Sequence, residues 1–263
     1  MSTRVERKVA AREARLEREA QIRVTATVRR RMRTLGGLMA GAAAVVLAAV
    51  VISSGGGAAN AASGGRLNGA AFSAKLFAGI PQHGTLLGRP SAPVRMVEYA
   101  DLQCPYCDAY SLQALPTLVQ DYVRAGKVSM QFENLSFIGP DSVAAGRTAA
   151  AAARQNKLWN FINLMYLNQG EENSGYVTAS YLRRLLGAVP GLNGRAALSA
   201  SVAPSADAAL AHANASATQA GVNATPSFLI GRAHAPLHQF QPKSLTAAPF
   251  ETAFNALLTR TSR

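Results

Sequence analysis

Two cysteines are the residues of this chain whose types and spacing are best suited to chemistry. Cys104 and Cys107 are the only cysteines among its 263 residues. They follow an apolar, strand-like run and precede a helical pattern, with Pro105 at the first helical position, where its missing N–H costs nothing. The unpaired N–H groups and the positive dipole end at a helix start favour a thiolate over a thiol. The pair is therefore predicted to be a redox-active dithiol.

Other roles for the two cysteines compete with this one. A structural disulfide between residues i and i+3 closes so small a loop that it removes little entropy from the unfolded chain. A zinc site needs about four ligands, and no histidine lies at a ligand-like spacing from the cysteines: the four are His83, His212, His234 and His238. The redox pair is therefore favoured and no metal is predicted. Two alternatives remain for the cysteines: a metal site and a degenerate pair that has lost its catalytic role.

The charge of the chain is concentrated in its first 34 residues. Lys and Arg total 27 against 14 Asp and Glu, which gives a net charge of +13. Because most of the excess lies in residues 1–34, it belongs to a basic tail, predicted to be helical, and not to the domain. The tail is either solvated or weakly attracted to anionic lipid headgroups. It lacks a nucleic-acid-binding motif, so no nucleic-acid partner is expected.

An uncharged apolar run follows the tail over residues 35–52. Its length is just enough to span a bilayer core. The arginines before it predict a single-pass anchor in the cell membrane, with the N-terminus in the cytoplasm and the domain outside it. A cleaved signal peptide is the alternative, because Ala59-Asn60-Ala61 resembles a cleavage site, and it would also export the domain. Residues 53–80, rich in Gly, Ala, Ser and Asn, are predicted to be a flexible linker with a reach of about 30 Å.

The remainder, residues 81–263, is predicted to be one α/β domain. A short edge strand is expected at 85–88 and a buried strand over Val94–Ala100. A helix kinked at Pro116 and a strand over 128–133 complete a right-handed βαβ unit.

Further along, helical patterns replace strands and then sheet character returns. The helical block, about residues 139–215, is predicted to be an insertion into an α/β domain built on a small mixed sheet. Its expected helices cover 142–154, 158–167, 178–186 and 205–220, and two strands (228–230 and 237–240) and a C-terminal docking helix (250–258) follow.

The chain resembles DsbA-like thiol–disulfide oxidoreductases, which have a thioredoxin fold with an inserted helical subdomain. Four segments carry the resemblance in the family's order, and together they span most of residues 85–260. Cys-Pro-Tyr-Cys also occurs in glutaredoxins, so the combination of segments carries more weight than the motif. The segments are Glu98 to Cys107, the helical stretch 149–161, the loop 168–175, and Gly221 to Phe228.

The resemblance implies roles for the two cysteines. Cys104 is expected to be the exposed nucleophile and Cys107 the buried resolving cysteine. Pro105, Tyr106 and the helix dipole are the candidates for lowering the pKa of Cys104. Glu98 stands where the family commonly has a buried acid, and it could carry the proton of Cys107 through a water. Its other interpretation is a strand residue whose carboxylate reaches solvent.

A second segment is expected to bind substrate. Thr225-Pro226 matches the family's cis-proline loop, which packs beside the disulfide and offers backbone groups to an extended chain. From the residues alone Pro226 would be an ordinary trans turn proline, so the cis bond is implied by the resemblance only. Residues 232–241 depart from the family's Gly-rich hairpin, which leaves the edge of the binding groove undefined.

The resemblance implies an enzyme that introduces disulfides into exported proteins through Cys104 and Cys107. It also implies re-oxidation by a membrane quinone enzyme, DsbB-like or vitamin-K-epoxide-reductase-like. No cofactor is expected beyond the redox-active disulfide. Two alternatives are a reductase or isomerase of the same fold, and a tethered peptide-binding or chaperone module in which the cysteines do not matter.

Overall fold

The computed structural model describes residues 67–259 of the chain. The predicted basic tail (1–34), the predicted membrane anchor (35–52) and the alternative cleavage site at residues 59–61 lie outside the described residues. Within 67–259, no helix has both the length and the apolar character needed to cross a membrane.

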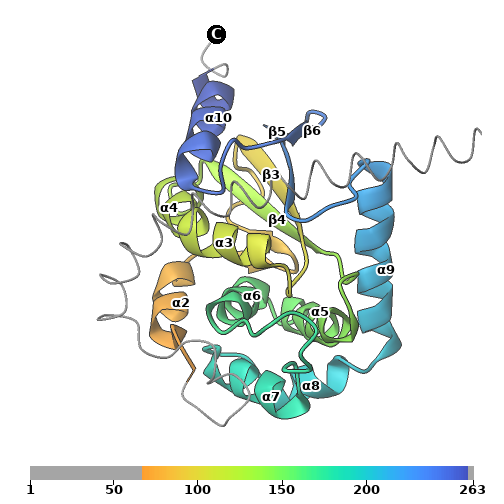
Figure 1. Cartoon of the computed structure of the whole chain (residues 1–263). Coiled ribbons are helices and arrows are strands. Elements are labelled where there is room, and N and C mark those ends of the chain that lie inside the picture. Colours follow the sequence, from red (N-terminus) through yellow and green to blue (C-terminus); the bar gives the residue numbers. More distant parts are fainter. Residues whose placement is uncertain (1–66, 260–263) are drawn as a thin grey trace, which may run out of the picture. The chain divides into compact units, whose positions relative to one another are not determined.

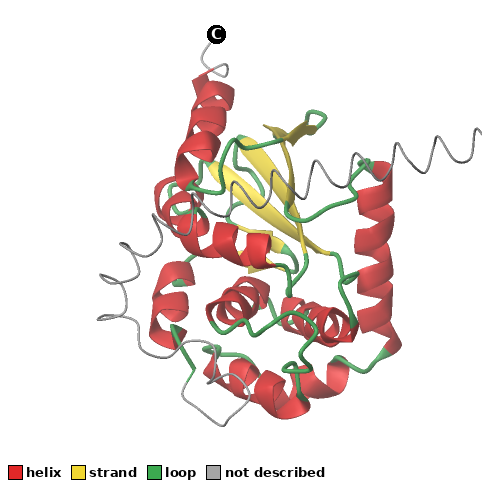
Figure 2. Cartoon of the chain, in the orientation of Figure 1, coloured by secondary structure: helices red, strands yellow, loops and turns green. Residues whose placement is uncertain are grey.

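A mixed sheet lies at the centre of the described domain (Figures 1 and 2). Its strand order is β1-β2-β4-β3-β5-β6, and only the central pair, β3 with β4, is parallel. This parallel pair, with a helix between its strands in sequence, is the predicted strand–helix–strand unit. The strands are β1 Gln82–His83, β2 Leu86–Leu87, β3 Val94–Ala100, β4 Val128–Asn134, β5 Ser227–Arg232 and β6 His238–Phe240.

The short strand expected at 85–88 forms, but it is not the edge of the sheet. β2 pairs with β4 on one side and with β1 on the other. Gly84, between β1 and β2, has a φ of 58°, a conformation that glycine adopts without steric cost. The resulting hairpin adds a two-residue strand too short to give an alternating pattern in the sequence.

β3 is buried on both faces, as its dense apolar sequence predicts. Val94, Met96 and Ala100 belong to the main core, whereas Val97 and Tyr99 pack into a second cluster with residues of α9 (Pro204–Gln219). Successive side chains of a strand point to opposite faces, so Glu98 lies on the face of Met96 and Ala100. In Figure 1, three helices lie on one side of the sheet and α9 on the other; the three are α3 (Pro105–Gln113), α4 (Leu115–Leu118) and α10 (Ala247–Thr259).

The helix after the cysteines is interrupted, as Pro116 predicts. It consists of α3 Pro105–Gln113, α4 Leu115–Leu118 and a π-helical segment, Val119–Val123. The break is at Ala114, whose φ is −105°. Pro116 cannot donate a backbone hydrogen bond, so the helix restarts with this proline in the first turn of α4.

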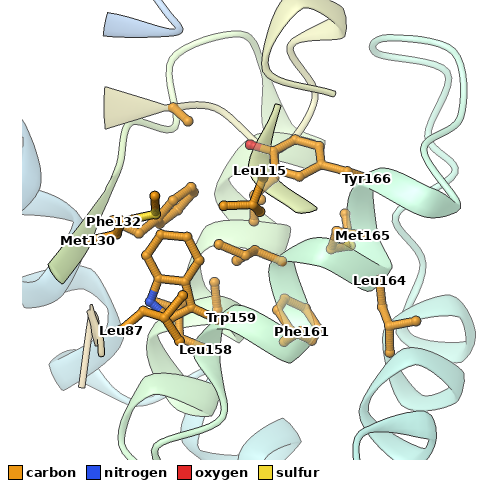
Figure 3. Close-up of a cluster of buried hydrophobic side chains, with 14 of the residues drawn as sticks. Leu87, Leu115, Met130, Phe132, Leu158, Trp159, Phe161, Leu164, Met165 and Tyr166 are labelled. Carbon is orange, nitrogen blue, oxygen red and sulfur yellow. The ribbon is translucent and has the colours of Figure 1, made fainter. Parts of the chain in front are cut away.

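Helices fill the chain between β4 and β5, over residues 140–219. Their core is α6, where Trp159 lies among side chains from β2, β4 and neighbouring helices (Figure 3). The Trp159 indole N–H donates to the carbonyl oxygen of Thr85 at 3.1 Å. α8 is missing from the predicted elements because its seven residues bury only Ala197. The helices are α5 Pro140–Ala153, α6 Leu158–Leu167, α7 Ala179–Ala188, α8 Gly194–Ala200 and α9 Pro204–Gln219.

The predicted flexible linker over 53–80 is wrong for its last part. Residues Ala70–Phe77 form α2, and Leu76 and Phe77 are buried in the main core. The Phe77 ring lies 6.5 Å from that of Trp159, and the Ser73 hydroxyl donates to the carbonyl oxygen of Asn160. The small residues of this stretch suggested a tether, but a few apolar contacts are enough to dock it on α6.

The C-terminal helix, α10 Ala247–Thr259, docks through two phenylalanines that are fully buried, Phe250 and Phe254. The Phe250 ring lies 5.1 Å from Tyr110 of α3, 4.9 Å from Phe228 of β5 and 5.3 Å from Phe240 of β6. Aromatic rings at such separations attract one another beyond their area burial. α10 thus closes the side of the sheet on which α3 lies.

Replacing Phe250 with alanine tests this docking. We expect F250A to lower the free energy of unfolding by about 3–5 kcal/mol, because it removes a fully buried ring and leaves a cavity. Urea denaturation followed by circular dichroism measures the change. Phe72 of α2 is 46% exposed, so F72A is the matched control and should cost less than half as much. Equal losses would contradict the packing described for α10.

Candidate active site

The two cysteines lie at the start of α3, as predicted. Cys104 is the N-cap residue, with extended backbone (φ −69°, ψ 121°), and Pro105 occupies the first turn. Both thiols are free in the structure. Cys107 is fully buried, and Cys104 is only 5% exposed. The expectation of an exposed nucleophile is therefore wrong: Cys104 is buried, although less completely than Cys107, and the Thr225 carbonyl lies against its sulfur.

The pKa values of the two thiols are shifted in opposite directions. The pKa of Cys104 is lowered to about 6, mainly by a hydrogen bond from the Cys107 thiol. Burial opposes this shift. Smaller contributions that also lower the pKa come from the Thr225 side chain and from the backbone N–H groups of Cys107 and Tyr106. Burial, reinforced by the neighbouring Cys104 and Glu98, raises the pKa of Cys107 well above its usual value. At neutral pH the reduced pair therefore consists of a Cys104 thiolate and a Cys107 thiol. This asymmetry suits one sulfur to be attacked and to leave, and the other to resolve.

The Thr225–Pro226 segment lies beside the cysteines, and its peptide bond is cis, as the resemblance implies. The Cys104 thiol donates to the carbonyl oxygen of Thr225 at 3.5 Å. This bond exists only while Cys104 is protonated, so the carbonyl does not lower the pKa of Cys104. The contribution of Thr225 that lowers it comes from the side chain. Residues 104 and 225, far apart in sequence, thus meet at the sulfur.

A groove opens next to this contact, with a cavity volume of about 380 Å³. Tyr106, which is 67% exposed, forms one wall, and Phe240 of β6 forms part of another. The residues that depart from the family pattern define its edge: β6 pairs with β5, and the Gln239 amide donates to the carbonyl oxygen of Ala220 at 2.8 Å. The groove is lined by Tyr106, Gly221, Val222, Asn223, Ala224, Pro226, Ser227, Phe228, Gln239, Phe240, Gln241, Pro242 and Leu245.

Glu98 is a buried acid, so the alternative of a carboxylate reaching solvent is wrong. It is 2% exposed and paired across the sheet with Phe132 of β4 and Phe228 of β5. Burial raises its pKa to about 8. A carboxyl that is protonated at neutral pH and electrostatically coupled to Cys107 can supply or accept the proton of that thiol.

Asp101 is a site residue that the sequence did not reveal. It is fully buried, and its carboxylate accepts from the backbone N–H groups of Gln103 (2.9 Å), Phe137 (3.1 Å) and Ile138 (3.2 Å) and from the Ser142 hydroxyl (2.6 Å). Its backbone carbonyl also accepts from the N–H of Cys104 at 3.0 Å. Asp101 therefore ties the turn before α3 to the loop after β4. An acid at the end of a buried strand was the only signal, and it is not specific.

A second acid, Asp108, lies in the first turn of α3. It is half-buried, and burial raises its pKa to about 6. Its Oδ1 atom is buried and has no hydrogen-bond partner among residues 67–259.

In the same range, no group of three or more His, Cys, Asp or Glu side chains is arranged to hold a metal ion.

The raised pKa of Glu98 predicts how stability depends on pH. Because the folded-state pKa is about 8 against 4.5 as the usual value, the folded chain retains a proton that the unfolded chain releases. Stability should fall as pH rises from about 4.5 to about 8, by on the order of a few kcal/mol from this group. E98Q should remove that part of the slope. Urea unfolding of the oxidised protein at pH 5 and pH 8 measures it, without titration of the thiols.

The control for this measurement is E171Q, because Glu171 is exposed. Its slope with pH should match that of the unmodified chain. If E98Q and E171Q show the same slope, the raised pKa of Glu98 is contradicted.

The acidity of Cys104 predicts its reactivity. In the reduced chain, alkylation of Cys104 by iodoacetamide should rise with pH to a plateau with a midpoint near 6, since the thiolate is the nucleophile. Mass spectrometry of the alkylated peptides should find Cys107 unmodified until the chain is denatured. C104S is the control and should show no modification below pH 8. A midpoint near the free-cysteine value of about 8.5 would contradict the geometry.

Known proteins share parts of this sequence. A thioredoxin family model matches residues 82–245. Probable disulfide bond formation protein D of Bacillus cereus is 36% identical over 98 residues, which are 36% of this chain and 45% of that protein. Disulfide bond formation protein D of Bacillus subtilis is 29% identical over 103 residues, 37% of this chain and 45% of that protein. The chain thus spans about half the length of the curated relatives it matches.

Solved structures share the fold. The crystal structure of oxidised BdbD from Bacillus subtilis superposes with a TM-score of 0.59 at 18% identity, covering 68% of this chain and 97% of that one. DsbA of Chlamydia trachomatis gives 0.58 at 18% identity, with 68% and 93% covered. A thioredoxin-like oxidoreductase from Silicibacter pomeroyi gives 0.51 at 26% identity, with 70% and 95% covered. The predicted α/β thioredoxin fold with inserted helices is therefore confirmed, and because the family model matches more than half of the sequence, this chain belongs to the thioredoxin family.

Proposed function

We propose that this chain is a membrane-tethered, extracytoplasmic thiol–disulfide oxidoreductase that introduces disulfides into exported proteins through Cys104 and Cys107. The observation that carries the proposal is that the pKa of Cys104 is lowered and the pKa of Cys107 is raised at the start of α3, beside Thr225. The name of the Bacillus relatives, disulfide bond formation protein D, supports the same reaction class.

The first step is attack by a substrate thiolate on the Cys104 sulfur of the oxidised pair. A new bond forms between the substrate sulfur and Cys104, and the bond between Cys104 and Cys107 breaks. Cys107 leaves with the electron pair, and because burial disfavours its thiolate it takes up a proton. Glu98, protonated at neutral pH because its pKa is raised to about 8, is the group that supplies this proton through a water.

The second step releases the product. A second thiolate of the substrate attacks the substrate sulfur of the mixed disulfide, and Cys104 leaves as a thiolate. The substrate has then lost two electrons and two protons. Both electrons are on the enzyme, as the Cys104 thiolate and the Cys107 thiol. One proton is on Cys107, delivered by Glu98, which regains its own proton from solvent, and the other proton goes to solvent. The low pKa of Cys104 makes it a good leaving group and stabilises the reduced enzyme, which drives electrons from substrate to enzyme.

The groove beside the cysteines is suited to hold the substrate during both steps. The backbone of the Thr225–Pro226 segment lies at the Cys104 sulfur, where an extended chain could pair with it. The groove has a mixed apolar and amide lining, which includes Phe228, Phe240 and Gln239. Such a surface accepts varied side chains, as an enzyme acting on many reduced proteins requires.

The direction of electron flow separates this proposal from a reductase or isomerase of the same fold. An equilibrium with glutathione buffers gives the potential of the pair. We expect an oxidising potential, well above the approximately −270 mV of thioredoxin. A thioredoxin-like value would reverse the direction and favour the reductase.

The partners in the proposal are exported proteins with free thiols and an enzyme that re-oxidises the pair. A quinone-linked membrane enzyme, DsbB-like or vitamin-K-epoxide-reductase-like, is the class we infer, since a tethered domain meets such a partner at the membrane. The membrane anchor in this proposal is residues 35–52, inferred from their uncharged apolar sequence. Alkaline extraction tests it: the full-length chain should stay with the membranes, and a variant lacking 35–52 should be released.

Substitution of Cys104 tests the activity. C104S should abolish oxidation of a reduced model protein, because the sulfur that is attacked is gone. C107S should retain a nucleophilic Cys104 that traps substrate as a stable mixed disulfide, visible by non-reducing electrophoresis. If C104S oxidises the model protein as fast as the unmodified chain does, the role of Cys104 is contradicted. If neither chain oxidises it and both suppress its aggregation equally, the redox proposal fails in favour of a peptide-binding module.

A further inference from the structure

Residues 168–175, the first part of the segment between α6 and α7, lie against the turn that carries the cysteines. The side-chain amide of Gln169 donates to the carbonyl oxygen of Leu102 at 3.0 Å and to that of Cys104 at 3.4 Å. One amide group from the helical insertion therefore spans the two carbonyls on either side of Gln103. No step of the disulfide exchange described above uses this residue.

Gln169 is held in place from behind. Its backbone N–H donates to the carbonyl oxygen of Tyr166 at 3.2 Å, and the carbonyl of the preceding Asn168 accepts from the Tyr181 hydroxyl at 2.8 Å. Gly170 packs directly on the Tyr176 ring, since a Cβ atom there would lie 2.7 Å from its Cγ. The amide of Gln169 thus projects from a fixed backbone.

The same loop contacts the turn a second time. The backbone N–H of Asn173 donates to the side-chain oxygen of Gln103 at 2.8 Å, and the Asn173 amide donates to the carbonyl oxygen of Ile138 at 3.2 Å. Gln103 in turn donates to the Ser142 hydroxyl at 3.0 Å. The turn is therefore held between this loop and the loop after β4.

We propose that Gln169 is a positioning residue of the redox pair, which fixes the carbonyl group of Cys104 and with it the turn that aims the first N–H groups of α3 at the Cys104 sulfur. The carbonyl of Cys104 also accepts the N–H of Asp108 at 3.1 Å, the first hydrogen bond of the helix. Two donors on one carbonyl set the orientation of the peptide that joins Cys104 to Pro105. The N–H groups of Tyr106 and Cys107 follow within the next turn and hydrogen-bond the sulfur.

This inference deepens the proposed function and rests on it only for its effect on disulfide exchange. The positioning itself is measurable on the reduced thiol without any substrate. An enzyme that proved to be a reductase would still show the effect on Cys104, so failure of one proposal is distinguishable from failure of the other.

The test is the pH titration of Cys104 in the reduced full-length chain, followed by thiolate absorbance and iodoacetamide alkylation. In Q169A, the N–H groups of α3 are aimed less well, and the acid dissociation constant of Cys104 should fall by roughly two- to tenfold. Q169E places an acceptor against two carbonyls and adds negative charge near the sulfur, so its decrease should be larger. The potential of the pair should become less oxidising in the same order.

Gln155 provides the matched control. Its amide donates to the carbonyl oxygen of Asn193 at 3.2 Å, and its side-chain oxygen accepts the N–H of the same residue at 2.9 Å. Like Gln169, its side-chain amide binds backbone groups of a distant segment, but that segment is not the turn that carries the cysteines. Q155A should lower thermal stability to an extent similar to Q169A and leave the titration of Cys104 unchanged.

The outcome that would overturn the proposal is a Cys104 titration that is the same in Q169A, Q169E and the unmodified chain, with stability alone reduced. That result would make Gln169 a structural bridge like Gln155. Should Q169A fail to fold, Q169M gives the same comparison, because methionine keeps the side-chain volume and removes the donor. A lowered acid dissociation constant in Q169M supports the proposal, and an unchanged one contradicts it.

Discussion

The site depends on stabilising a sulfur anion with hydrogen bonds from the turn itself. The pKa of Cys104 is lowered by donors within the turn and from Thr225, and burial opposes them. Backbone donors act only over a short distance and a narrow range of angles. The turn must therefore be held in one conformation, and Asp101, Gln169 and Asn173 each hydrogen-bond to a different part of it. That requirement explains the polar side chains of Asp101 and Gln169 and the contact made by Asn173.

Two acids three residues apart show how the surroundings of a group decide its role. Asp101 accepts four hydrogen bonds through its side-chain oxygens, which offset the cost of burying a polar group. No such bond to the Glu98 carboxyl is found within residues 67–259, and burial alone raises its pKa to about 8. Asp101 therefore organises the turn through its four hydrogen bonds, and Glu98 can hold a proton near Cys107. The chemical difference comes from packing and not from the residue types.

The sequence was informative where one local pattern determined the structure. The strand Val94–Ala100, the helix broken near Pro116 and the helices on either side of residue 156 follow from apolar periodicity and proline chemistry. The Cys104 and Cys107 positions followed from their spacing. The hydrogen bonds that Asp101 and Gln169 make to distant segments could not be predicted, because they join residues 36 to 67 positions apart whose polar side chains carry no periodic signal. The docking of α2 was missed for a related reason, since its few apolar side chains bury themselves against distant α6.

The aromatic cluster around Phe250 has a mechanical consequence for this arrangement. Phe228 and Phe240 line the groove, and through Phe250 and direct contact they also support Tyr110, on the helix that carries the cysteines. The floor of the groove and the support of the reactive helix are thus the same rings. The shared rings hold the groove and the Cys104 sulfur at a fixed distance from each other. That distance is therefore set before a substrate chain binds in the groove. Less conformational entropy is lost when a substrate sulfur is brought into line with the disulfide.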